Sequence, residues 1–163
     1  ANIQSSGSTA VIAYFTEDKC FLANVGDTRA VMFKSGKPLR VSKDHKPTHA
    51  GEEARIRSLG GYVNKDGRVN GIIAVARALG DFDIQPFVTF EPDVQVYETL
   101  ARGEALIMAC DGVWDVISDE LVCKLVNAEP DPVKAAMRIR DHAYLFGSMD
   151  NVSVIVVRHP LEG

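Results

Sequence analysis

The sequence has little of what disulfide frameworks, zinc sites and membrane proteins require. It contains 3 cysteines. Cys20, Cys110 and Cys123 lie in apolar segments, at spacings unlike those of metal-binding motifs, and an odd count leaves room for at most one disulfide. We therefore interpret them as reduced thiols of a core. No apolar run approaches the roughly 18 residues that span a bilayer, so we expect no membrane partner.

Clustered positive charge is missing as well. The chain has 18 Lys and Arg against 22 Asp and Glu, which gives a net charge of −4, and the basic residues are scattered along it. A nucleic-acid partner is therefore not expected, because proteins that bind nucleic acid gather Lys and Arg on one face. The first six residues also lack the basic and apolar regions of a secretory signal. We expect a cytoplasmic protein, with the nucleus as the alternative.

The apolar residues that are present, 46% of 163, suffice for the core of a single domain. Strands are predicted at 8–16, 19–26 and 29–34, because apolar runs rich in β-branched residues are separated there by polar turns. A helix is predicted over 48–59, where glycines follow its end. The glycine-rich segment 61–90 is predicted to be a long irregular excursion, and loops of that kind often border functional sites.

The second half returns to regular elements. Strands are predicted at 94–100, 104–110 and 151–157, and the β-branched composition of the last is typical of a central strand. Two helices are predicted, one capped by Ser118 and one capped by Asp131. On the second helix we expect these side chains to face inward: Val133, Ala136, Met137, Ala143 and Tyr144. The order of the elements predicts an α+β fold with a mainly antiparallel core.

Three aspartates share one local pattern. Asp27, Asp111 and Asp150 each stand at the end of a strand-like segment beside Gly or Asn. Each alone is open to interpretation as a turn residue. Asp111 and Asp150, however, flank the most apolar strands, where an unpaired carboxylate is costly and no Lys or Arg follows closely. A hard divalent cation would compensate them, and carboxylates without clustered His or thiolate ligands favour Mg²⁺ or Mn²⁺ over zinc.

Eight segments of the chain resemble the successive motifs of one enzyme family. They are, in chain order, SSGSTAVIAY, LANVGDTRAV, VSKDHKP, EEARIRSLGGYV, RVNGIIAVARALGD, EPDV, LIMACDGVWDVIS and GSMDNVSVIVV. Together they cover nearly the whole chain and are similar to the metal-dependent protein serine/threonine phosphatases of type 2C, in their eukaryotic-like branch.

The resemblance implies a two-sheet antiparallel β-sandwich flanked by helices, with two or more Mg²⁺ or Mn²⁺ ions at one end. It also implies the reaction, which is the hydrolysis of phosphoserine or phosphothreonine in proteins by a metal-activated water, without a phosphoenzyme. The expected partners are therefore phosphorylated protein substrates.

The resemblance also implies the site residues. Asp111 and Asp150 match metal-binding, catalytic aspartates, and Asp27 matches an aspartate of a further, weaker metal site that Asp111 also serves. Asp115 matches a catalytic acidic residue near the metal-bound waters. Arg77, beside the irregular segment, is the candidate for substrate contact. The residues expected to line or shape the site are Thr9, Gly112 and Asn151.

For three other residues a structural role is the stronger interpretation. His45 precedes Lys46 and Pro47, which favours a turn over acid–base chemistry. Arg29 follows Asp27 inside a strand, where an ion pair is a simpler role than phosphate binding. Trp114 is most simply a core aromatic.

The family pattern is incomplete at its N-terminal end. The chain begins at Ala1 without an initiator methionine, and it contains no Asp-Gly-His, although the resemblance implies such a motif, with an aspartate that bridges the two main metals. We therefore expect residues 1–163 to be a partial type 2C phosphatase-like catalytic domain that lacks its N-terminal strands. An N-terminal segment or a second chain would complete it. Ala76, where the family usually has Ser or Thr, is a second departure.

Three interpretations stay open at this point. We favour an active phosphatase whose remaining strands lie elsewhere, in which case residues 1–163 alone are an incomplete and inactive fragment. The alternatives are a non-catalytic phosphatase-like binding module, which the absent bridging motif would suit, and a structural domain whose aspartates are turns. The presence of Asp27, Asp111, Asp115 and Asp150 together favours the enzyme, because a binding module has no chemical need of all four.

Overall fold

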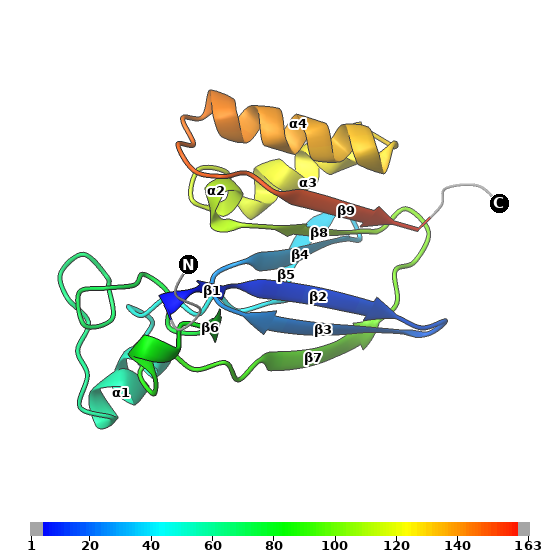
Figure 1. Cartoon of the computed structure of the whole chain (residues 1–163). Coiled ribbons are helices and arrows are strands. Elements are labelled where there is room, and N and C mark those ends of the chain that lie inside the picture. Colours follow the sequence, from blue (N-terminus) through cyan, green and yellow to red (C-terminus); the bar gives the residue numbers. More distant parts are fainter. Residues whose placement is uncertain (1–4, 160–163) are drawn as a thin grey trace.

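Two antiparallel sheets form the body of the molecule, which the computed structural model describes over residues 5–159. The three-stranded sheet has the order β2 (Ala10–Phe15), β3 (Lys19–Val25), β7 (Asp93–Glu98). The four-stranded sheet has the order β5 (Lys37–Arg40), β4 (Arg29–Lys34), β8 (Ala105–Ala109), β9 (Val154–Arg158). They lie face to face, with helices above the second (Figure 1). The predicted α+β sandwich is confirmed.

The register of the four-stranded sheet brings three distant turns to one end. Arg29 of β4 pairs with Ala109 of β8, and Ala109 also pairs with Val154 of β9. Because both pairings are antiparallel, the end of β8 lies beside the beginnings of β4 and β9. The segments just outside these strand ends hold the predicted site aspartates.

The apolar run of β8 is buried on both faces. Ile107 belongs to the cluster beneath the helices, together with Ile139, and Leu106 belongs to the cluster between the two sheets, together with Leu22. A strand covered on both sides needs no alternation of polar and apolar residues. This explains why the sequence of β8 is apolar throughout.

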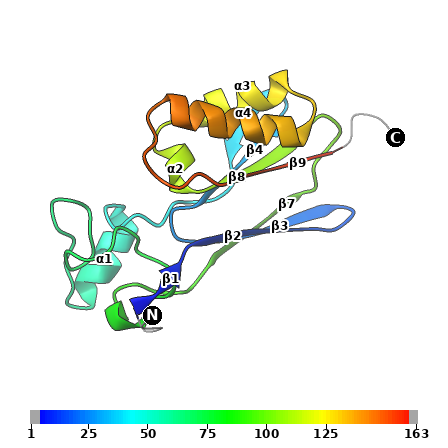
Figure 2. The same cartoon turned by 45° about the horizontal axis from the view of Figure 1, so that its top comes forward.

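Three helices follow β8: α2 (Asp111–Trp114), α3 (Asp119–Ala128) and α4 (Pro132–Leu145). The longer two cover the outer face of the four-stranded sheet (Figure 2). Ser118 caps α3 by accepting a hydrogen bond from the Leu121 N–H, and Asp131 caps α4 by accepting from two N–H groups. Both predicted caps are confirmed. Within the described residues, no helix has the length and apolar character to cross a membrane.

The predicted inward face of α4 is mostly wrong. Val133, Met137 and Tyr144 are 67%, 47% and 78% exposed, whereas Ala143 is buried as predicted, together with Ala135 and Ile139. The buried side chains recur every fourth residue, and two of them are alanines, so the helix packs closely through a narrow strip. The prediction placed Val133, Met137 and Tyr144 inward because they are large and apolar, so the predicted face was turned away from the strip that is actually buried.

Apolar surface is left uncovered on the other side of the sandwich. In residues 5–159 no helix covers the outer face of the three-stranded sheet (Figure 1), where Ile12, Tyr14 and Val94 are each more than half exposed. Strand β9, predicted to be central from its composition, is an edge strand in this range.

A separate lobe lies beside the sandwich and holds the excursion together with α1 (Ala50–Ser58). Its other elements are β1 (Gly7–Ser8), β6 (Leu79–Gly80) and the 3₁₀ helix η2 (Phe82–Ile84). The predicted helix and irregular excursion are both found. Ile56 of α1 packs in a small cluster of its own with Val69 and Val88.

We predict that Ile107→Ala lowers the free energy of unfolding by about 2–5 kcal/mol, because it opens a cavity beneath the helices. The matched control is Ile72→Ala, at a side chain that is 61% exposed, where the change should stay within about 0.5 kcal/mol. Urea denaturation of the full chain measures both. Equal losses at the two positions would contradict this packing.

Candidate metal centre

Asp27 lies in the tight turn between β3 and β4. Gly26 has φ +99°, a value that favours glycine, and a Cβ there would lie 2.2 Å from Cγ2 of Thr9. Thr9 is therefore packed against the turn itself. The Asp27 carboxylate is only 6% exposed. Burial, and then repulsion by Asp111, raise the pKa of Asp27 to about 6, against the opposing effect of Lys46.

The segments that carry Asp111 and Asp150 approach closely because Gly112 has no side chain. A Cβ on Gly112 would lie 2.2 Å from the carbonyl oxygen of Asn151 and 3.4 Å from Cβ of Asp150. The Ser148 hydroxyl donates to the Gly112 carbonyl at 2.7 Å, which ties the same two segments together. The structure thus places Gly112 and Asn151 where the chain before β9 meets the start of α2.

The short helix α2 is held in place by Trp114. This residue is 6% exposed, and its indole N–H donates to the Ala109 carbonyl at 2.9 Å. The Arg29 guanidinium lies over its ring at 5.2 Å and pairs with Asp44 and Asp119 at 2.6 and 2.8 Å. The structural roles predicted for Trp114 and Arg29 agree with these contacts, which fix the helix that carries Asp111 at its beginning.

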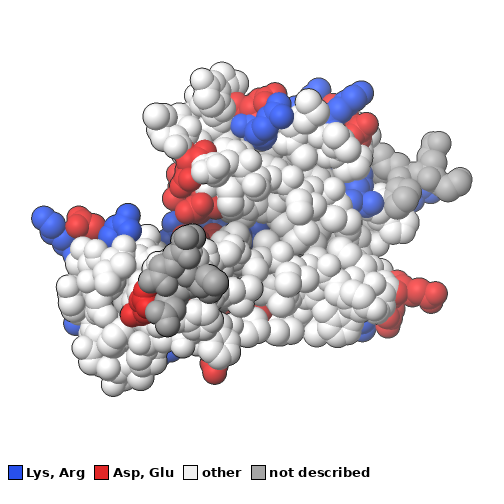
Figure 3. All heavy atoms as spheres, in the orientation of Figure 1, with Lys and Arg blue, Asp and Glu red and all other residues white. Residues whose placement is uncertain are grey.

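Lys46 stands among the carboxylates of this region. Its Nζ lies 2.9 Å from Oδ1 of Asp115 and 3.9 Å from Oδ2 of Asp27. Burial opposes the charged form, but the ion pair with Asp115 and the attraction of Asp27 and Asp111 outweigh it and raise the pKa of Lys46. Figure 3 shows acidic side chains gathered in a hollow of the surface over α2.

These donors fit a hard divalent cation in type and charge. Asp111 and Asp115 repel the Asp27 carboxylate, and all three attract the ammonium of Lys46, so three carboxylates surround one lysine charge. Carboxylate oxygens are the ligands that Mg²⁺ and Mn²⁺ prefer. Across residues 5–159, however, no three side chains of His, Cys, Asp or Glu are close enough to form a ready metal site. The aspartates therefore provide an incomplete, carboxylate-only set.

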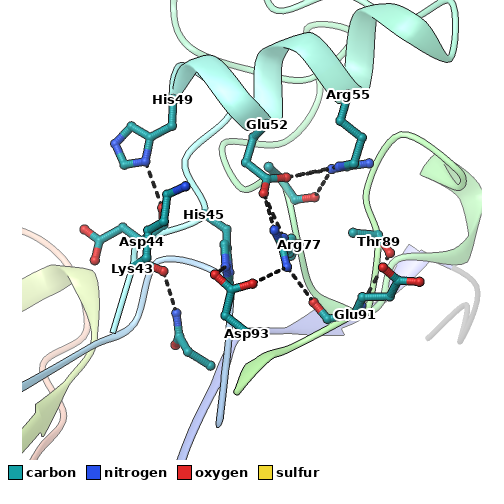
Figure 4. Close-up of polar contacts among 12 residues, drawn as sticks. Lys43, Asp44, His45, His49, Glu52, Arg55, Arg77, Thr89, Glu91 and Asp93 are labelled. Carbon is teal, nitrogen blue, oxygen red and sulfur yellow. Dashed lines mark hydrogen bonds and ion pairs between the residues drawn. The ribbon is translucent and has the colours of Figure 1, made fainter. Parts of the chain in front are cut away.

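Arg77 is engaged by a second group of charged residues, in the lobe (Figure 4). Its guanidinium donates to Glu52 at 2.5 and 2.9 Å, to Asp93 at 3.0 Å and to the Glu91 carbonyl at 3.0 Å. Burial alone would raise the pKa of Glu52, but its bonds to Arg77 and Arg55 hold it below the ordinary value. Substrate contact by Arg77 stays a prediction, and a phosphate would have to compete with these carboxylates.

His45 joins the two groups of residues. The Gly26 N–H donates to Nδ1 of His45 at 3.0 Å, so the ring proton belongs on Nε2, which lies 3.1 Å from Asp93. Burial first, and then Arg77, lower the pKa of His45. The His45 N–H donates to the Gly26 carbonyl, and the His45 carbonyl accepts from the Ala76 N–H. The neutral, fully buried ring agrees with the structural role predicted for it.

Sequence reasoning missed Glu52 and Lys46. Glu52 is only 3% exposed, and its position four residues before the buried Ile56 was a signal that both lie on one helix face. Lys46 had no comparable signal, because its partners lie in distant segments. The assignments of Asp27, Asp111 and Asp150 to metal binding, and of Asp115 to catalysis near the metal-bound waters, remain predictions.

A family model described as Protein phosphatase 2C matches residues 1–152. Probable protein phosphatase 2C 59 of Arabidopsis thaliana is 41% identical over 157 residues, which are 95% of this chain and 50% of that protein. The chain thus spans about half the length of this curated relative.

Solved structures with the same fold agree with this match. A phosphatase from a pathogenic strain of Toxoplasma gondii has a TM-score of 0.81 at 35% identity, over 88% of this chain and 49% of that chain. The catalytic domain of serine threonine protein phosphatase PstP, in complex with 2 manganese ions, has a TM-score of 0.67 at 20% identity, over 94% of this chain and 59% of that chain. The family model and the relatives together show that this chain belongs to the protein phosphatase 2C family.

Proposed function

We propose that residues 1–163 form part of the catalytic domain of a protein phosphatase that hydrolyses phosphoserine or phosphothreonine with Mg²⁺ or Mn²⁺. The observation that carries the proposal is that the strand ends next to Asp27, Asp111 and Asp150 lie at one end of the four-stranded sheet in a member of this family. The two manganese ions named for the PstP structure support the choice of metal.

Each residue has a definite task in this proposal. Asp111 and Asp150 would hold the principal ions, Asp27 with Asp111 would serve a further, weaker site, and Asp115 would lie near the metal-bound waters. When bound, the ions supply positive charge to the phosphoryl oxygens and make water a nucleophile at neutral pH. Gly112 allows the two segments to approach closely, and the tryptophan of α2 keeps them in place.

The surroundings of the centre suit a phosphorylated protein as substrate. A cavity of about 450 Å³ opens beside Asp150 and is lined by Tyr144, Leu145 and Val152 with Arg140. An apolar wall next to the reacting group would receive a side chain of a phosphopeptide. We also propose a further N-terminal segment or a second chain that completes the metal ligands, and a cytoplasmic or nuclear location.

Replacement of the two principal ligands is the first test. We predict that, once the proposed N-terminal segment or second chain is supplied, Asp111→Asn and Asp150→Asn each reduce turnover of a phosphothreonine peptide by roughly 100-fold or more, because each weakens metal binding. Phosphate release with Mn²⁺ measures the effect, and circular dichroism checks folding. The control is Asp83→Asn, at an exposed carboxylate in η2. Undiminished activity in either ligand variant would refute the site.

The buried carboxylate of Asp27 predicts a pH dependence of the metal-free protein. Its pKa is raised from 3.8 to about 6, so the folded protein holds the proton of Asp27 more tightly than the unfolded chain does. The contribution of Asp27 to the free energy of unfolding is therefore full below pH 4 and is lost as the pH rises through 6. The loss amounts to about 3 kcal/mol. Asp27→Asn should therefore stabilise the full chain in EDTA at pH 8 much more than at pH 4.

Urea denaturation at the two pH values measures this difference. Asp66→Asn, on an exposed loop, is the control and should keep the pH dependence of the wild type. If Asp27→Asn also kept that dependence, the raised pKa of Asp27 would be disproved.

A further inference from the structure

We propose that Lys46 is a built-in counter-cation, whose ammonium group competes with a divalent cation for Asp27 and Asp115 and so lowers the metal affinity of this side of the centre. The inference rests on the proposed function, because it concerns the same carboxylates. It assigns a role to a residue outside the predicted metal ligands.

The backbone places Lys46 firmly, whereas its side chain is free to move. The preceding residue, His45, is fixed to Gly26 by two hydrogen bonds and to Ala76 by one. From this anchored position the Lys46 side chain reaches Asp115 at 2.9 Å and Asp27 at 3.9 Å. It is 31% exposed, and its four-carbon stem is flexible, so the ammonium can swing out to solvent.

A divalent cation and the Lys46 ammonium repel each other when both contact these carboxylates. An Mg²⁺ ligand lies at about 2.0–2.1 Å from the ion, so an ion bound to Oδ1 of Asp115 would stand within close range of an ammonium 2.9 Å from the same oxygen. A dication repels a neighbouring ammonium twice as strongly as a monocation does. A metal ion bound at Asp115 would therefore weaken the ion pair of Lys46 with that carboxylate.

The contacts also explain what Lys46 does before a metal binds. Asp27, Asp111 and Asp115 together attract it, and its removal would leave their negative charges facing one another at short range. Its ion-pair contacts lie with Asp115 and Asp27. The competition thus acts at Asp115 and Asp27, and a metal ion would occupy these carboxylates only at high metal concentration.

Mn²⁺ binding to the full chain tests the competition directly. Electron spin resonance of free Mn²⁺ would be titrated for the wild type, Lys46→Met, Lys46→Arg and the control Lys43→Met, whose exposed side chain is not among the ion pairs of the described residues. We expect Lys46→Met to bind its weakest Mn²⁺ roughly tenfold more tightly. Lys46→Arg, which keeps the charge, and Lys43→Met should resemble the wild type.

A melting experiment tests the counter-cation role by itself. In EDTA at pH 7.5, Lys46→Met should melt at a lower temperature than Lys43→Met, and saturating Mn²⁺ should abolish the difference. Equal melting temperatures in EDTA would overturn the role of Lys46 in the metal-free protein.

The outcomes separate this inference from the proposed function. If the wild type binds Mn²⁺ and Lys46→Met binds it equally or more weakly, the competition is overturned and the metal centre stands. If neither protein binds Mn²⁺, the metal centre and the competition are both overturned.

Discussion

Repulsion between neighbouring carboxylates is the physical constraint that shapes this end of the sandwich. Asp27 is buried in a glycine turn and raised in pKa by its surroundings, and Asp111 begins a helix pinned by a buried tryptophan. Neither can move away, because the backbone pairing of β4 with β8 holds them in place. A fold that fixes like charges together in this way needs a cation, and Lys46 meets the need only in part. A divalent ion would meet it more fully.

In the group of charged residues around Arg77, by contrast, the carboxylates are fully paired with positive charge. Arg77 and Arg55 neutralise Glu52, and His45 with Arg77 holds the pKa of Asp93, at the start of β7, below its ordinary value in spite of burial. These carboxylates are satisfied, so their function is to hold the excursion against the sandwich. The carboxylates around Arg77 are neutralised and suit a structural role, whereas those around Lys46 carry excess negative charge and suit a functional site.

Local signals allowed much of the fold to be predicted. The helix caps at Ser118 and Asp131 and the apolar run of β8 depend on neighbouring residues only, and the structure agrees with them. The buried face of α4 and the place of β9 depend on what packs against them, which composition does not reveal. For the same reason the four aspartates could be singled out from their motifs, whereas Lys46 could not, because its partners come from elements far apart in the sequence.

The central claim is that Asp111 and Asp150 hold divalent ions together. Anomalous diffraction from crystals of the full chain soaked in Mn²⁺ tests it most directly. The claim predicts strong anomalous peaks at roughly 2.0–2.2 Å from carboxylate oxygens of both residues. The absence of such peaks in well-ordered density, with the two carboxylates turned away from each other, would contradict it.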